Sequence, residues 1–128
     1  PMTRAMVTTV LAQLDGVDTA GGAVWYENGL NWAVAHSISD GKNPGQLATR
    51  EQFVSMLYRY AGNPAATEKE LNFADADQVS GYAREAMRWA VENGILSGFG
   101  DGTLAPDGQT SRAQAAAMLK RYMEIMVP

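Results

Sequence analysis

A chain of 128 residues is long enough for one domain with a substantial buried core. Ten basic and fourteen acidic side chains give a net charge of −4, which argues against a general nucleic-acid binder, because phosphate contacts need a basic face. The absence of cysteine excludes disulfides, thiol catalysis and cysteine-ligated zinc, and one histidine leaves almost no material for a catalytic triad. Because no apolar run approaches the roughly 20 residues of a membrane span, we expect no membrane insertion.

One pattern, repeated three times along the chain, predicts three α-helices. The helices cover residues 3–16, 49–62 and 111–124. In each, a Thr or Ser precedes an Arg, and apolar residues follow three, seven and ten positions after that Arg. This spacing places the apolar side chains on one face of a helix.

The sequence also predicts how these helices begin. Thr49 with Gln52, and Ser111 with Gln114, predict capping boxes, in which the hydroxyl accepts one backbone N–H and the amide reaches back to another. The first helix keeps only the hydroxyl half, at Thr3.

A second helical element precedes the last two of these helices. Residues 25–38 align with residues 82–95, and in both the aromatic residues stand seven positions apart, so we expect them to share one helix face. Each element leads into a Gly-rich connection that can adopt the positive φ of tight loops, and the later connection is five residues longer. The repeating unit is therefore a helix, a Gly-rich loop and a second helix.

This repeat divides the chain into four segments. Residues 1–16 are the final helix of an incomplete first unit, 17–62 the second unit, 63–72 a linker and 73–128 the third unit. Because each unit has too few apolar residues to fold alone, we expect one compact all-α domain. The helical pattern is already present in the first residues of the chain, so we interpret the chain as a piece of a longer protein.

The last unit resembles an S-layer homology repeat nearly end to end. The resemblance rests on Phe73-Ala74-Asp75, Tyr82, Trp89-Ala90-Val91-Glu92-Asn93-Gly94-Ile95, the stretch from Gly98 to Asp107, and Ser111-Arg112-Ala113-Gln114. Residues 25–62 resemble a second, shorter copy, and residues 3–16 the tail of a first. The resemblance implies a pseudo-threefold helical spindle, part of a larger exported protein at the bacterial cell surface.

The same resemblance implies a ligand, secondary cell-wall polysaccharide linked to peptidoglycan, often with a pyruvylated sugar that carries a carboxylate. By position, it assigns ligand contacts to Arg4, Arg50 and Arg112, with the loop glycines Gly41, Gly98 and Gly102 near the ligand. The family signature Thr-Arg-Ala-Glu has lost its Glu in all three copies, where Met6, Gln52 and Gln114 stand instead.

The chemistry of the Arg position supports this assignment independently. An Arg in the first turn faces the positive end of the helix dipole, at a cost of about 0.3–1 kcal/mol when exposed. A bound carboxylate offsets that cost, because free backbone N–H groups and a guanidinium both donate to it. The alternative is an ion pair between each Arg and a structural carboxylate, such as Asp75 or Asp101.

Other functions have weaker support in the sequence. Nothing in the spacing singles out Glu92 and Asp101 as a catalytic pair, so we expect no enzyme activity and no cofactor. The Asp residues of 75–77 and 101–102 lack the regular ladder of an EF-hand, so no metal site is expected. A protein-interaction module, or self-association into a surface layer, remains the alternative function.

The remaining aromatic residues favour structural roles. Helical spacing indicates core packing for Trp25, Trp32 and Trp89, with sugar stacking as the alternative. We expect the lone His36 on the surface beside a loop.

Overall fold

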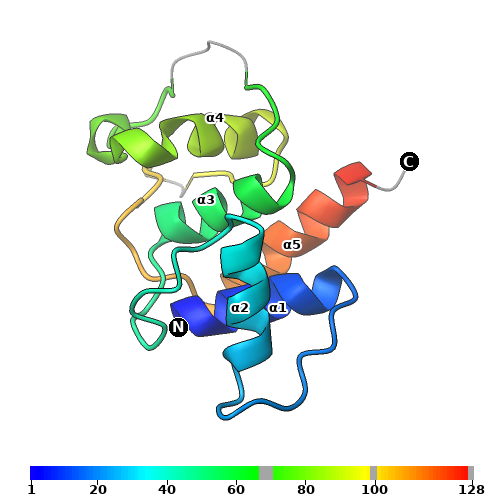
Figure 1. Ribbon diagram of the computed structural model, residues 1–128. Helices are drawn as coiled ribbons and strands as arrows, with labels where there is room; N and C mark the ends of the chain where they lie inside the picture. Colours follow the sequence, from blue (N-terminus) through cyan, green and yellow to red (C-terminus); the bar gives the residue numbers. More distant parts are fainter. Residues whose placement is uncertain (67–70, 99–100, 127–128) are drawn as a thin grey trace.

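The computed structural model describes residues 1–66, 71–98 and 101–126. These residues form five α-helices (Figure 1). They are α1 (Arg4–Leu14), α2 (Glu27–Ala35), α3 (Arg50–Tyr60), α4 (Arg84–Glu92) and α5 (Arg112–Met126). Two 3-10 turns, η1 (Ala76–Gln78) and η2 (Gly81–Ala83), precede α4. These ranges contain no β-strand, and the prediction of an all-α fold is confirmed. Parts of the expected linker and of the last Gly-rich loop, residues 67–70 and 99–100, lie outside the described residues.

Both predicted capping boxes are confirmed. Thr49 N–H donates to Gln52 Oε1 at 2.9 Å, and Gln52 N–H donates to Thr49 Oγ1 at 3.3 Å. Ser111 and Gln114 make the same reciprocal pair at 3.1 and 3.0 Å. These side chains satisfy backbone donors that a helix start otherwise leaves unpaired.

The first helix is capped more completely than predicted. Met6 N–H donates to Thr3 Oγ1 at 3.1 Å, which is the expected hydroxyl half, and the Met6 sulfur accepts Thr3 N–H at 3.4 Å. A thioether is a weak acceptor, so the sulfur takes the place of the glutamine oxygen with a weaker bond.

The prediction that the paired aromatic residues share one helix face is wrong. Helices α2 and α4 begin two residues after Trp25 and Tyr82, which lie in the preceding turns and are 60% and 56% exposed. The second member of each pair is inside its helix: Trp89 is buried, and Trp32 packs half-buried with its ring centroid 6.0 Å from that of Tyr60. Core packing therefore holds for Trp89 and in part for Trp32.

A closed ring of three backbone hydrogen bonds joins the segments that lead into α1, α3 and α5. Met2 N–H donates to Thr110 O at 2.9 Å, Thr110 N–H to Ala48 O at 3.2 Å, and Ala48 N–H to Met2 O at 2.8 Å. All three residues are buried. Each lies two positions before the Arg that begins its helix, so the ring relates the three helix starts by a pseudo-threefold axis.

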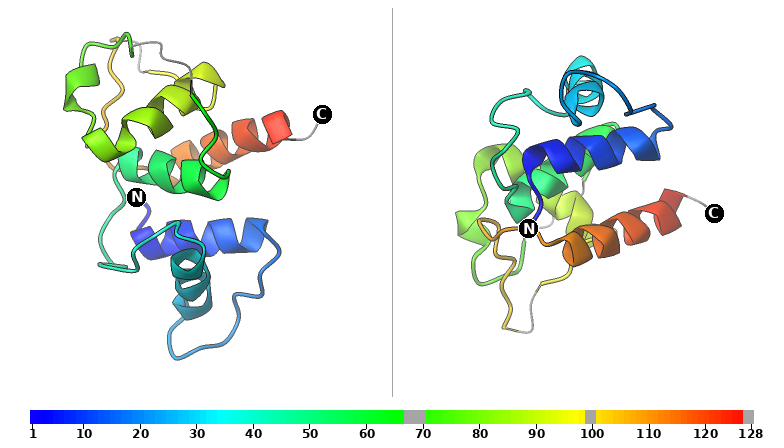
Figure 2. Two further views of the ribbon diagram at one scale, coloured as in Figure 1. Left: turned by 45° about the horizontal axis from the view of Figure 1, so that its top comes forward. Right: turned by 90° about the horizontal axis from the view of Figure 1, so that it is seen from below.

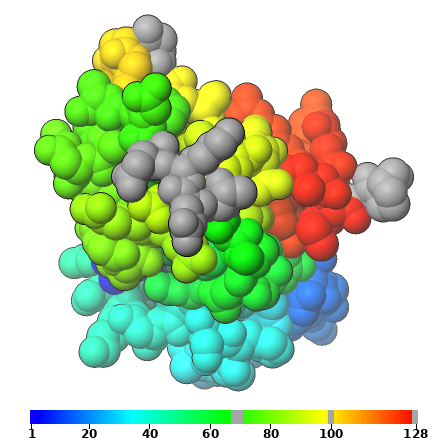
Figure 3. Space-filling view, turned by 90° about the horizontal axis from the view of Figure 1, so that it is seen from above, coloured from blue at the N-terminus to red at the C-terminus, as the bar shows by residue number. Residues whose placement is uncertain are grey.

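The other two helices pack on the outside of this arrangement. Helix α2 crosses α1, and α4 lies along α3, so that α1 and α3 are enclosed between α2 and α4 (Figure 2). The core between them contains fully buried side chains of α1 and α3, among them Val7, Leu11, Phe53 and Leu57. Helix α5 lies to one side, where its last turns stay open to solvent (Figure 3). Within the described ranges, no helix is both long and apolar enough to cross a membrane.

We predict that Leu57→Ala lowers the free energy of unfolding by about 2–5 kcal/mol, because it removes a fully buried side chain and leaves a cavity. Leu47→Ala is the control, since Leu47 is 38% exposed, and should cost less than about 1 kcal/mol. Urea unfolding followed by circular dichroism measures both, and equal losses would contradict the assignment of the core.

Candidate functional site

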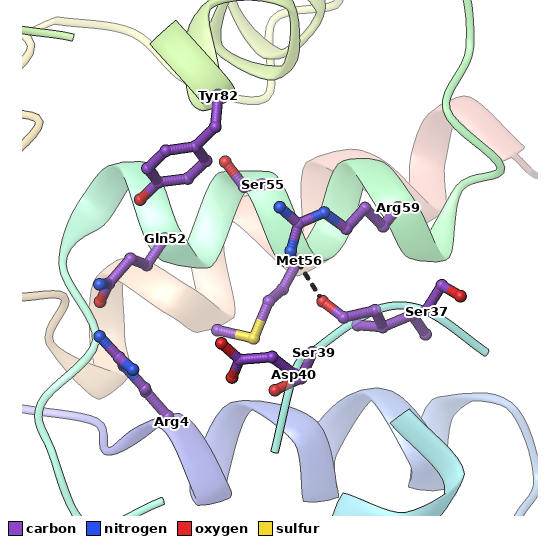
Figure 4. Close-up of a pocket in the computed structure, with 10 residues that line it drawn as sticks. Arg4, Ser37, Ser39, Asp40, Gln52, Ser55, Met56, Arg59 and Tyr82 are labelled. Carbon is purple, nitrogen blue, oxygen red and sulfur yellow. Dashed lines mark hydrogen bonds between the residues drawn. The ribbon is translucent and has the colours of Figure 1, made fainter. Parts of the chain in front are cut away.

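A cleft of about 530 Å³ opens between α1, α3, the residues after α2 and the turn before α4 (Figure 4). We call it the Arg4 cleft. It is lined by Arg4, Ser37, Ile38, Ser39, Asp40, Gln52, Ser55, Met56, Arg59 and Tyr82. Two arginines and several neutral hydrogen-bonding groups therefore converge on one space, drawn from four separate segments.

Arg4 enters the cleft from the first turn of α1. Its backbone N–H donates to Gln46 O at 2.9 Å, so the loop after α2 holds the start of the helix. The side chain is half-buried and points toward Gln52 (Figure 4). Within the described part of the chain, Arg4 Nε is buried and has no hydrogen-bond partner.

Ser55 supplies a second unpartnered group in the Arg4 cleft. The residue is 2% exposed, and its Oγ finds no partner among the described residues. Buried polar atoms are normally hydrogen-bonded, and leaving one unpaired costs about 1–3 kcal/mol. Arg4 and Ser55 both line the cleft, but these two atoms are shielded from solvent beneath its surface.

Arg59 brings a second guanidinium into the cleft from α3. Its Nη1 donates to Ile38 O at 3.0 Å, and the residue lines the cleft. Sequence reasoning missed Arg59, although the signal was present: Arg121 stands at the same position of α5 and donates to Ile95 O at 3.2 Å.

Tyr82 lies at the upper rim of the cleft (Figure 4). It is held there by Glu51, which is 3% exposed and accepts Ser80 Oγ–H at 3.1 Å and Ser80 N–H at 3.3 Å. Partial burial, and then the Glu51 carboxylate, raise the pKa of Tyr82, so its phenol, which is neutral at pH 7 in any case, also stays neutral at higher pH. A neutral, half-exposed ring can both stack and hydrogen-bond.

The cleft also contains one carboxylate. Asp40 Oδ1 accepts Lys42 N–H at 2.9 Å, and the neighbouring Ser39 Oγ accepts Gly41 N–H at 3.1 Å. Both bonds shape the turn after α2. Arg4 and Arg59 are positively charged and Asp40 is negatively charged, so the residues that line the cleft have a net positive formal charge.

Arg50, the second predicted ligand residue, is in the interior. It is 5% exposed, and its guanidinium donates to Ala105 O at 2.8 Å and to Gln114 Oε1 at 2.9 Å. Burial lowers its pKa. The side chain therefore fastens the last loop and α5 to α3, through a carbonyl and an amide oxygen.

The two carboxylates considered as partners for the arginines bind backbone and hydroxyl groups. Asp75 is nearly buried and accepts the N–H groups of Leu104 and Ala105, both at 2.8 Å. Asp101 accepts Thr103 Oγ1–H at 2.7 Å, which lowers the pKa of the Asp101 carboxyl. Both carboxylates thus organise the loop that leads into α5.

Arg112, the third predicted ligand residue, is exposed at a different cleft. This cleft has a volume of about 390 Å³ and lies between α1 and α5. Its other walls are mainly apolar and include Met6, Val10, Trp25 and Leu119. The arginine has fewer polar neighbours here than Arg4 has.

The three predicted glycines have conformational or packing roles. Gly41 has φ +77° and follows Asp40 directly, which places it next to the Arg4 cleft without lining it. A Cβ on Gly98 would lie 2.4 Å from Phe73 Cε1, so Gly98 is where the loop packs against that ring. Gly102 is exposed with open space around it, and its carbonyl accepts Ala74 N–H at 2.9 Å. His36 is exposed, as expected.

We predict a large loss of stability at one arginine and almost none at another, although the two hold equivalent positions in the repeat. Arg50→Met should lower the free energy of unfolding by about 2–4 kcal/mol, because Ala105 O and Gln114 Oε1 lose a charged donor. Arg4→Met should change it by less than about 0.5 kcal/mol. Urea titrations of both variants provide the comparison, and a large loss for Arg4→Met would show that Arg4 is structural.

Comparison with known proteins adds an independent identification. The family model described as the S-layer homology domain matches residues 72–116. The chain is 33% identical over 109 residues to an amylopullulanase of Thermoanaerobacterium thermosulfurigenes, an alignment that covers 78% of this chain and 6% of the relative. It is 36% identical over 84 residues to a surface-layer 125 kDa protein of Lysinibacillus sphaericus, covering 66% of this chain and 7% of the relative.

A third relative is named as a different enzyme. The exoglucanase XynX of Acetivibrio thermocellus is 33% identical over 109 residues, covering 78% of this chain and 10% of that enzyme. The chain thus spans a tenth or less of each of these three relatives, and proteins with different names share the segment that resembles it. The helical fold, the family match and these relatives agree: the chain belongs to the S-layer homology domain family.

Proposed function

We propose that this chain is a noncatalytic anchoring module that binds an acidic secondary cell-wall polysaccharide in the Arg4 cleft. The observation that carries the proposal is the cleft itself, in which Arg4 and Arg59 line one space together with the polar residues Gln52 and Tyr82. The ligand we propose carries a carboxylate on a pyruvylated sugar and is linked to peptidoglycan.

Family membership supports the broader part of this function. S-layer homology domains are noncatalytic modules that anchor proteins at the cell surface, so the chain is extracellular and associated with the cell wall. The named enzymes among the relatives match over a small part of their length, as expected for an anchor appended to different activities.

The chemistry of the cleft suits a carboxylated sugar. A guanidinium binds both oxygens of a carboxylate through two parallel N–H donors, and such charge-assisted bonds are stronger than neutral ones. Arg4 lines the cleft and is only half-buried, so its guanidinium is within reach of a ligand there. The amide of Gln52 suits sugar hydroxyls, and the exposed ring of Tyr82 offers an apolar surface to a sugar face.

The proposal assigns the leading role to one of the three equivalent arginines. Arg50 is buried and already donates to Ala105 O and Gln114 Oε1. Arg112 is exposed beside a mainly apolar cleft, whose lining includes one hydroxyl residue, Thr9, and no amide side chain. Arg4 combines access with polar neighbours, so we expect one dominant binding site per chain.

The net charge of −4 gives no long-range attraction toward an anionic polymer. Binding therefore depends on the local arginines and should weaken as salt screens them.

We predict that Arg4→Gln weakens binding of pyruvylated wall polysaccharide at least tenfold, the effect of losing about 1.4 kcal/mol of charge-assisted bonding. Isothermal titration calorimetry of the purified chain measures the affinity. Arg112→Gln is the matched control, because it removes the same charge from the equivalent position of α5, and it should change the affinity less than threefold.

Equal losses for Arg4→Gln and Arg112→Gln would contradict a dominant Arg4 site. Absence of binding by a folded, unsubstituted chain would contradict the proposed ligand.

A further inference from the structure

We propose that Glu51 is a positioning residue for the Arg4 cleft, which strengthens sugar binding by fixing the ring of Tyr82 at the rim. The inference rests on the proposed function, because the sugar is the wall polysaccharide proposed above. It deepens that function by one residue that does not itself line the cleft. Glu51 is the second residue of α3 and lies directly before Gln52.

Glu51 is an acid in a place where acids are rare. Its side chain is buried, and a carboxylate is almost never fully buried unless hydrogen bonds or a charged partner offset the loss of water. Its oxygens accept Ser80 Oγ–H at 3.1 Å and Ser80 N–H at 3.3 Å. The same position holds Ala5 in α1 and Ala113 in α5. The common scaffold therefore does not require an acid here.

Ser80 connects Glu51 to the rim of the cleft. It lies just before the turn η2, which contains Tyr82, so its hydrogen bonds fasten that turn to α3. Partial burial raises the pKa of Tyr82, and the Glu51 carboxylate raises it further through its charge and a side-chain hydrogen bond. Because the Tyr82 ring is more than half exposed, packing restrains it weakly, and these polar contacts hold it in place.

The other outer helix lacks this connection. Helix α2 packs on α1 as α4 packs on α3, and the repeat places Ala5 and Ala23 where α3 and η2 have the Glu51–Ser80 pair. Two alanine side chains can neither donate nor accept a hydrogen bond. Trp25, at the rim position of that unit, lines the mainly apolar cleft between α1 and α5. The polar pair thus occurs beside the polar cleft and is replaced by alanines beside the apolar one.

A fixed ring favours binding, because a sugar that stacks on it does not have to immobilise it first. The Tyr82 ring extends from the turn before α4 toward Gln52, into the space that a ligand would occupy (Figure 4). The charge of Glu51 has the opposite effect, since a negative group near the cleft repels an acidic sugar. Any gain in affinity from Glu51 must therefore come through Tyr82.

Isothermal titration calorimetry with pyruvylated wall polysaccharide tests this dependence as a double-mutant cycle. We expect Tyr82→Ala to weaken binding about fivefold, and Glu51→Ala to weaken it by a similar factor. In the Tyr82→Ala background, Glu51→Ala should cause no further loss, because the ring through which it acts is gone. Trp25→Ala is the matched control, since Trp25 is the counterpart of Tyr82 at the other cleft, and it should change the affinity less than about twofold.

Two further variants separate position from charge and from folding. Glu51→Gln keeps an oxygen that accepts both Ser80 donors, so binding should be at least as tight as in the unsubstituted chain. Ser80→Pro removes the N–H and the hydroxyl that Glu51 accepts, and the φ of −63° at Ser80 suits proline. It should weaken binding by about the same factor as Glu51→Ala. Circular dichroism checks that each variant is folded.

A measurement without ligand reports on Tyr82 itself. In Glu51→Gln the Tyr82 phenol should ionise at lower pH, because the carboxylate that raises its pKa has lost its charge. Ultraviolet absorbance follows this ionisation, and Tyr82→Phe identifies the step that belongs to Tyr82.

Full affinity in folded Glu51→Ala or Ser80→Pro, a further loss when Glu51→Ala is added to Tyr82→Ala, or an unchanged Tyr82 ionisation in Glu51→Gln would each overturn this proposal alone. Absence of binding by the unsubstituted chain would overturn the proposed function and this proposal with it.

Discussion

The hydrogen bonds that join Met2, Ala48 and Thr110 impose the constraint on which the rest of this structure depends. They are backbone bonds, so they tolerate three different side chains at the three positions. Because a helix starts two residues after each of them, the ring gathers three helix N-termini around one axis. The Gly-rich loops after the outer helices then reach the first amides of α1 and α3, which fixes where clefts between units can form.

The three arginines hold equivalent backbone positions, but their side chains have different surroundings. Arg50 meets a loop carbonyl and Gln114, and it becomes part of the interior. Arg112 lies beside Met6, whose thioether caps a helix but offers little to a guanidinium. Arg4 lies beside Gln52 in an open cleft. The repeat thus supplies a common scaffold, and the neighbours of each arginine decide whether it supports the fold or remains available to a ligand.

Local sequence patterns were enough to predict much of the fold. Periodicity and capping patterns located α1, α3 and α5 to within two residues or so, and the all-α class followed from them. The positions of Trp25 and Tyr82 were not predictable from spacing, because a seven-residue interval implies a shared face only inside a continuous helix. The burial of Arg50 and the presence of Arg59 in the site depend on loops far away in sequence. Only the recurrence of Arg59 as Arg121 offered a local signal.

The central claim is that one guanidinium, that of Arg4, receives the acidic sugar. Arginine Nε–H resonances in ¹H–¹⁵N spectra of the labelled chain report on each guanidinium separately during a titration with pyruvylated wall polysaccharide. The account predicts a saturable shift of the Arg4 resonance, while those of Arg50 and Arg112 stay close to their starting positions. A saturable shift at Arg112 with none at Arg4 would contradict it.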